Sequence, residues 1–189
     1  MMGAGKTTVG QALAERLGRP YCDSDEQVRR NTGRTVPELF EQEGEAAFRA
    51  EEKRALAEAV ASDEPAVVSV AGGAVLDPDN RRLLREAGTV VWLRAEVATL
   101  ANRVGSGEGR PLLAHDPEET LGRLYEGRRP LYEDLADVVV DVDTLSPEET
   151  VERIVEALKC KRSEHFRADG ARTSSPGSDG CGAQPHGRH

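Results

Sequence analysis

Hydrophobic positions along the chain alternate between short apolar runs and longer segments with helical spacing. Four runs predict buried strands: 20–23, 66–70, 89–93 and 138–142. In the last three, the apolar residues are continuous rather than alternating, which is typical of parallel strands covered on both faces. The pattern therefore predicts an α/β fold, with a parallel sheet between layers of helices.

Helical segments fill the intervals between these strands, and several of their ends carry recognisable signals. Gly18 is placed to end the first helix, and Thr35-Val-Pro-Glu38 has the pattern of a capping box with Pro in the first turn. Pro130 is expected to interrupt the helix that contains it. The predicted helices span residues 7–17, 25–30, 45–61, 80–87, 95–103, 117–135 and 147–158.

The last part of the chain, residues 159–189, has a different composition. It is rich in Gly, Ser and Pro and contains almost no large apolar residue. Such a segment cannot bury enough apolar surface to offset the entropy cost of ordering it. We therefore expect one domain over residues 1–158, followed by a disordered C-terminal tail.

Composition narrows the functional class. The 189 residues include 34 acidic and 25 basic side chains, which gives a net charge of −9. A nucleic-acid-binding domain would instead show a basic stripe, so we do not expect a nucleic-acid partner. No apolar run is long enough to span a membrane, and no signal peptide is evident, so we expect a cytoplasmic protein without a membrane partner. Cys22, Cys160 and Cys181 lack metal-like spacing and are expected to be free thiols.

The chain opens with a motif that predicts phosphate binding, Gly3-Ala4-Gly5-Lys6-Thr7-Thr8, directly before an amphipathic helix. It matches the end of the pattern G-x-x-x-x-G-K-[ST]. Glycines let backbone N–H groups approach phosphate oxygens, and the helix points its positive N-terminus at the same place. Lys6 would reach the β- and γ-phosphates, and the Thr7 hydroxyl would bind Mg²⁺. A Gly-rich helix cap with a chance Lys-Thr pair is the plainer alternative.

Part of the usual context of this motif is absent. The first Gly of the pattern would stand one position before Met1, and no buried strand precedes the motif. We therefore expect the natural start of the protein to lie upstream. Without that strand, its neighbours would have unpaired backbone groups in the interior, so we expect the chain as written to be poorly stable.

Five further polar motifs follow in order. They are Asp23-Ser-Asp25, Phe48-Arg49-Ala-Glu51-Glu52, Ala71-Gly72-Gly73-Ala74-Val75, Arg110-Pro-Leu-Leu113 and Arg128-Arg129-Pro130-Leu131-Tyr132. Taken singly, they have plain explanations: a helix cap, a helix ion pair with Glu45 and Glu52, a tight turn, an exposed loop charge and a solvated helix face. Together, after a phosphate loop, they favour phosphoryl transfer to a small hydroxylated carboxylic acid. Arginines suit a carboxylate, and an aspartate can orient a hydroxyl.

In this order and spacing, the motifs across residues 1–158 resemble the shikimate kinase family. The resemblance implies a three-layer P-loop fold of the nucleoside-monophosphate-kinase type with a lid loop. It also implies ATP- and Mg²⁺-dependent phosphorylation of the 3-hydroxyl of shikimate, in the pathway to the aromatic amino acids. We expect the protein to act on this small molecule as a monomer.

The resemblance also implies a role for each matched position. Gly3, Ala4, Gly5, Lys6, Thr7 and Thr8 would bind the phosphates of ATP, with Lys6 also catalytic. Thr7 and, through water, Asp23 would hold Mg²⁺. Asp25 would hold shikimate hydroxyls and act as the base, and Arg49, Gly72, Gly73 and Arg128 would bind shikimate. Arg110 would be the catalytic lid arginine that closes on ATP.

Two alternatives and one departure from the family pattern stay open at this point. Another small-molecule kinase, similar to gluconate kinase, is the alternative enzyme, and an inactive truncated homologue is the alternative without activity. A GTP-binding switch is disfavoured because the sequence has no Asn-Lys-x-Asp motif. The departure is Ala71, where the family commonly has Gly; Ala would be tolerated there if the position needs no positive φ.

Overall fold

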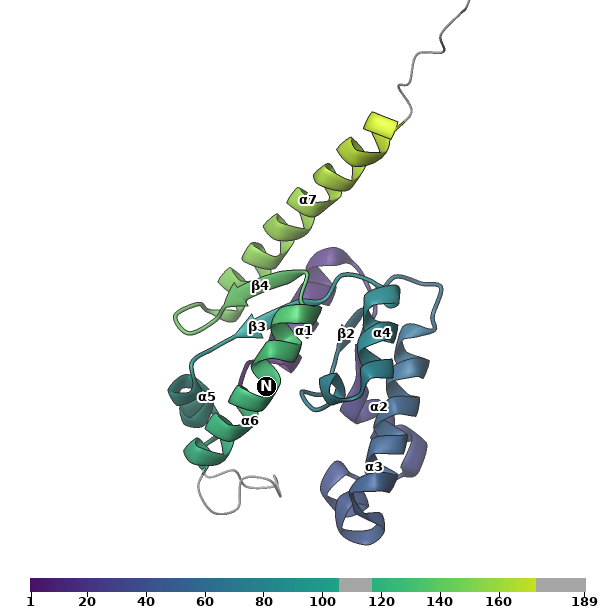
Figure 1. Cartoon of the computed structure of the whole chain (residues 1–189), viewed down its shortest axis with the longest axis vertical. Helices are drawn as coiled ribbons and strands as arrows, with labels where there is room; N and C mark the ends of the chain where they lie inside the picture. The colour runs from purple at the N-terminus through teal and green to yellow at the C-terminus, as the bar shows by residue number, and fades with distance from the viewer. Residues whose placement is uncertain (106–116, 173–189) are drawn as a thin grey trace, which may run out of the picture.

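A computed structural model of the protein describes residues 1–105 and 117–172, with side chains up to residue 161. Helices and strands alternate along the chain, as the apolar pattern predicts (Figure 1). In order, the elements are α1 (Lys6–Leu17), β1 (Tyr21–Asp23), α2 (Ser24–Thr32), α3 (Val36–Val60), β2 (Val67–Ser69), the 3-10 helix η1 (Ala74–Leu76), α4 (Pro78–Ala87), β3 (Val91–Arg94), α5 (Val97–Val104), α6 (Pro117–Leu135), β4 (Val138–Asp141) and α7 (Pro147–Arg172).

The strands are parallel, as predicted, but they do not form one sheet. Strand β1 pairs with β2, and β3 pairs with β4, so the described strands make two separate two-stranded sheets. Burial is also less complete than the continuous apolar runs predict. In β4, Val138 and Val140 are buried while Val139 is 43% exposed. The prediction of full cover on both faces is therefore wrong for this strand.

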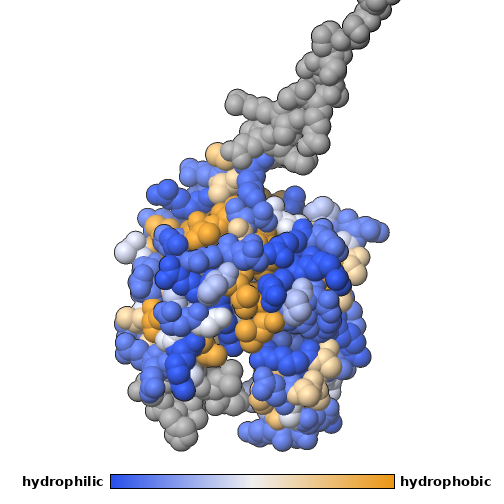
Figure 2. Space-filling model, in the orientation of Figure 1, coloured by the Kyte–Doolittle hydropathy of each residue, from blue (hydrophilic) through white to orange (hydrophobic). Residues whose placement is uncertain are grey.

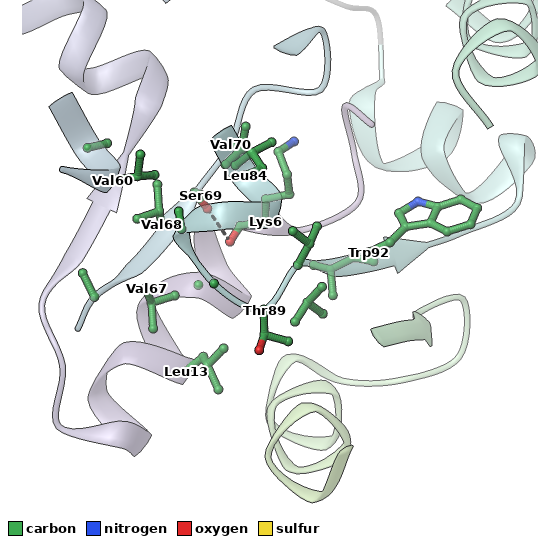
Figure 3. Close-up of a pocket in the computed structure, with 18 of the residues that line it drawn as sticks. Lys6, Leu13, Val60, Val67, Val68, Ser69, Val70, Leu84, Thr89 and Trp92 are labelled. Atoms are coloured by element: carbon green, nitrogen blue, oxygen red, sulfur yellow. Dashed lines mark hydrogen bonds between the residues drawn. The ribbon is translucent and has the colours of Figure 1, made fainter. Parts of the chain in front are cut away.

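An apolar cavity of about 420 Å³ lies between the two sheets and is lined by residues from both β2 and β3. Figure 3 shows Val67 and Val68 on one side of it and Thr89 and Trp92 on the other, with Leu13 of α1 nearby. Close-packed protein interiors contain few voids larger than a water molecule. This space therefore marks an interruption between the two sheets.

Apolar side chains pack around this interruption in a main core and a smaller one. The main core joins α1, the sheets and α6 and α7, and includes Trp92, which stacks on Tyr132. Four buried residues of α2 and α3, Val28, Leu39, Phe48 and Ala55, form the smaller core. On the face drawn in Figure 2, apolar side chains remain visible along the middle, with polar side chains on either side.

Helix ends follow most of the predicted signals. Gly18 and Gly33 cap their helices in the left-handed conformation. Thr35 and Glu38 form the predicted capping box, so α3 begins at Val36, and Gly44 (φ 82°) separates this first part from the helix predicted at residues 45–61. Pro130 does not interrupt α6, which continues to Leu135. Buried Tyr132 and Leu135 anchor the last turns of α6 in the core, so tertiary packing offsets the lost backbone hydrogen bond.

The last helix is longer than predicted. It continues past Leu158 to Arg172 and projects from the rest of the protein (Figure 1). The prediction of disorder from residue 159 is thus wrong as far as residue 172, and residues 173–189 lie outside the described part. Lys161 in the extension pairs with Asp137, which precedes β4, and this contact helps the helix to continue. No described helix is both long and apolar enough to cross a membrane.

Candidate active site

The phosphate loop enters α1 through two glycines in the left-handed region. Gly3 has φ 77° and Gly5, the N-cap of α1, has φ 83°. A Cβ on Gly3 would lie only 2.7 Å from the backbone oxygen of Leu100, so space as well as conformation requires glycine there. Ala4 between them is buried. The predicted loop therefore has the left-handed turns that glycine permits, and it packs tightly against α5.

Positive groups gather at the start of α1. The first turn of this helix contains no acidic residue, and Thr7 and Thr8 are exposed there. Lys6 folds back over the loop, and its Nζ donates to the backbone oxygen of Met1 at 3.0 Å. Backbone N–H groups and the helix dipole favour an anion at such a place, and the ammonium of Lys6 adds a full positive charge.

The two predicted magnesium-binding side chains lie together beside this loop. The Thr7 hydroxyl donates to Oδ2 of Asp23 at 3.4 Å, although the two residues lie on different elements. Oxygen ligands of this kind suit Mg²⁺, which binds proteins through one or two side chains and completes its shell with water and phosphate oxygens. No group of three or more Asp, Glu, His or Cys side chains in the described part could enclose a metal. The two oxygen donors of Thr7 and Asp23 fit a magnesium ion that takes its remaining ligands from water and a nucleotide.

Asp23 and Asp25 have different surroundings. Asp23 caps α2, since its Oδ1 accepts from the Asp25 backbone N–H at 3.0 Å, so the plain explanation of a helix cap also holds. Asp25 is exposed as a whole residue, yet enough protein surrounds its carboxyl to perturb it. Burial raises the pKa of Asp25, the Asp23 charge raises it further, and nearby Lys6 opposes the rise.

Arg49 of α3 is held by carboxylates on its own helix. Its guanidinium donates to Glu52 at 2.8 Å and to Glu45 at 3.3 Å, and it lies over the ring of Phe48. Glu52 is only 3% exposed, so one side of the pair is inaccessible to water. A Cβ on Gly73 would lie 2.5 Å from Nη1 of Arg49, which places this arginine directly against the glycine turn. The helix ion pairs are present, but they also orient Arg49 toward a second element.

Arg128 of α6 is buried, at 6% exposure, whereas its neighbour Arg129 is exposed and pairs with Glu133. The interpretation of both as a solvated helix face is therefore wrong for Arg128. Burial raises the pKa of Glu52, while the positive charges of Arg49 and Arg128 oppose the rise. Arg128 is thus close enough for its charge to lower the pKa of Glu52, the carboxylate that holds Arg49. Side chains of α3 and α6 therefore contribute to the same site.

The glycine turn after β2 is fixed from two sides. The Tyr132 hydroxyl donates to the backbone oxygen of Gly72 at 2.7 Å. The backbone N–H of Ala71 donates to the buried hydroxyl of Ser24 at 2.9 Å. No described residue other than glycine has a positive φ, so Ala71 fits its position without strain. The condition under which alanine would be tolerated there is met.

The structure brings most of the predicted residues to one region. The phosphate loop with Asp23 forms one end, and Asp25, Arg49, Arg128 and the turn at residues 72–73 form the other. The two ends meet at Met1, whose backbone lies 3.4 Å from a Cβ on Gly72 and whose oxygen binds Lys6. Arg110 lies outside the described residues.

Two tyrosines in this region had no predicted role. Tyr132 belongs to the quoted Arg-Arg-Pro-Leu-Tyr motif, which placed it near Arg128 but did not indicate its contact with Gly72. Tyr21 donates to Asp23 at 3.1 Å from two positions earlier in β1. Alternate residues of a strand point to the same face, so this spacing was the available signal.

Comparisons with known proteins agree with this geometry. The shikimate kinase family model matches residues 2–159. A shikimate kinase from Ruegeria pomeroyi is 45% identical over 86% of this chain and 83% of its own length, and one from Streptomyces coelicolor is 47% identical over 86% and 94%. The structure of a shikimate kinase from Acinetobacter baumannii in complex with shikimate superposes with a TM-score of 0.82 and 37% identity, covering 85% of this chain and 89% of that one. The chain therefore belongs to the shikimate kinase family.

Proposed function

We propose that this site transfers the γ-phosphoryl group of ATP to the 3-hydroxyl of shikimate, giving ADP, shikimate 3-phosphate and a proton. The observation that carries the proposal is the meeting of Arg49, Arg128 and the Gly72-Gly73 turn beside a phosphate loop. Membership of the family and the likeness to a relative with shikimate bound support it.

The two arginines bind the carboxylate of the substrate. A guanidinium presents N–H groups in a planar fork that matches a carboxylate, and two forks from different helices fix its orientation. Glu52 holds Arg49 in place, and the packing around Arg128 restricts its movement. The turn at residues 72–73 lies against Arg49 and lines the same end of the site. These residues position the substrate before any chemistry occurs.

Asp25 orients the attacking hydroxyl and accepts its proton. A base acts best when its pKa lies near the working pH, and the raised pKa of Asp25 moves the carboxyl in that direction. Nearby Lys6 opposes the rise and keeps the carboxylate available in its charged form. Phosphoryl transfer requires positioning and charge neutralisation more than covalent chemistry by the protein.

The phosphate loop holds the other reactant. Residues 3–8 bind the phosphates of ATP through backbone N–H groups, and Lys6 turns from Met1 toward the β- and γ-phosphates. Thr7 and Asp23 hold Mg²⁺, which when bound neutralises charge on the phosphate oxygens. Arg110, which the family resemblance suggests as a lid arginine, lies outside the described residues.

We further propose that the protein works as a cytoplasmic monomer. All the described groups of the site come from a single chain, so its assembly requires no second copy. ATP as phosphoryl donor fits the cytoplasm. Sedimentation or light scattering at the enzyme's working concentration tests the oligomeric state directly.

The decisive experiment measures ADP release with ATP, Mg²⁺ and shikimate, with gluconate as the control substrate. Release that depends on shikimate, together with a product phosphorylated at the 3-hydroxyl, is expected. Preference for gluconate would assign a different acceptor. ATP binding without turnover by a folded protein would indicate an inactive homologue and overturn the proposal.

A further inference from the structure

A hydroxyl outside the predicted site lies against the proposed magnesium-binding carboxylate. Tyr21 of β1 donates from Oη to Oδ2 of Asp23 at 3.1 Å. The Thr7 hydroxyl donates to the same oxygen at 3.4 Å, while the other oxygen accepts the Asp25 backbone N–H at 3.0 Å. Asp23 is therefore held through both of its oxygens by three different residues.

The fold makes room for this tyrosine. Gly10 of α1 faces the ring, and a Cβ at that position would lie 2.7 Å from Cε2 of Tyr21. Any side chain on Gly10 would therefore displace the ring or the helix.

We propose that Tyr21 is a positioning residue that orients Asp23 toward Mg²⁺. This inference rests on the proposed magnesium site of Thr7 and Asp23. A carboxylate that acts on a metal through water must keep its direction, and a hydrogen bond to one oxygen limits rotation about the Cβ–Cγ bond. Groups that orient metal-binding side chains in this way typically change metal affinity about 10–100-fold when they are removed.

The test compares Tyr21→Phe with the unaltered protein. Phenylalanine keeps the ring against Gly10 and removes only the hydroxyl. We expect about tenfold weaker binding of Mn²⁺ in the presence of ADP, followed by electron paramagnetic resonance, and a similar rise in the Mg²⁺ concentration for half-maximal activity. The KM for shikimate and the melting temperature should stay within experimental error. Tyr125→Phe on α6 is the matched control, because Tyr125 is half-buried and its charged surroundings are Arg94, Glu96, Arg129 and Glu133, which lie outside the proposed magnesium site.

One further variant separates the possible failures. Asp23→Asn reports on the magnesium site itself. If it weakens Mn²⁺ binding while Tyr21→Phe does not, the positioning role is refuted and the site stands. If neither variant changes Mn²⁺ binding, the proposed site fails. If Tyr21→Phe lowers the melting temperature and raises the shikimate KM as much as it weakens metal binding, Tyr21 is only a packing residue and the inference is overturned.

Discussion

The cavity between β2 and β3 leads to a quantitative prediction about stability. Its volume is about 420 Å³, and residual cavities cost about 24 cal/mol per Å³, so an empty cavity of this size would cost at most about 10 kcal/mol. This is comparable with the whole stability of an ordinary domain, about 5–15 kcal/mol.

The perturbation is an extension of the chain before Met1 by Val-Val-Leu-Ile-Val-Gly. Met1 lines the cavity, so the added strand would enter directly between β2 and β3. Ordering five strand residues costs about 1.5 kcal/mol each, or about 7.5 kcal/mol in all, which leaves a net gain of at most about 2.5 kcal/mol. For a chain of this size, 1 kcal/mol corresponds to about 2–4 °C, so we expect the melting temperature to rise, by at most about 5–10 °C.

The assay is thermal unfolding followed by circular dichroism, with hydrogen exchange measured in β2 and β3. The matched control carries Gly-Ser-Gly-Ser-Ser-Gly, which has the same length but neither apolar nor β-forming side chains. Protection should increase in both strands for the apolar extension only, because a central strand pairs with both edges. Equal melting temperatures for the two extended proteins would refute the reasoning that the cavity accepts a strand.

Three substitutions test the site itself. Arg128→Lys should raise the KM for shikimate about tenfold or more, because lysine cannot form the planar fork of hydrogen bonds to a carboxylate. In steady-state kinetics the KM for ATP should stay unchanged, and equal changes in both KM values would contradict the assigned role. Gly73→Ala should raise the same KM several-fold, since its Cβ would lie 2.5 Å from Nη1 of Arg49, and an unchanged KM would show that the guanidinium moves freely. Asp25→Asn should lower kcat about 10²–10⁴-fold while raising the melting temperature at pH 7. The raised pKa of Asp25 means that the folded protein holds this proton more tightly than the unfolded chain does. The stability gain of the variant should therefore fade as the pH falls below the ordinary pKa range of an aspartate. A gain that persists at such a pH would argue against the carboxyl as its source.

Local signals in the sequence predicted much of the fold and most of the candidate site. Capping at Thr35 and Glu38, the glycine stop at Gly18 and the loop before α1 depend on neighbouring residues, so their physics is contained in a short stretch of chain. The order of motifs likewise indicated which residues meet, because parallel strands separated by helices place their carboxyl ends at one edge.

Tertiary structure decided the features that depend on distant contacts. Arg128 and Arg129 are equivalent in the sequence pattern, and only the packing of α6 buries one and leaves the other exposed. Pro130 stays within a helix because the residues after it are anchored in the core, and α7 continues past Leu158 toward a contact with Asp137. The hydrogen bond from Tyr21 to Asp23 requires a ring-sized space at Gly10 on another element. Such features follow from which surfaces meet in space, and the chain's local preferences do not determine them.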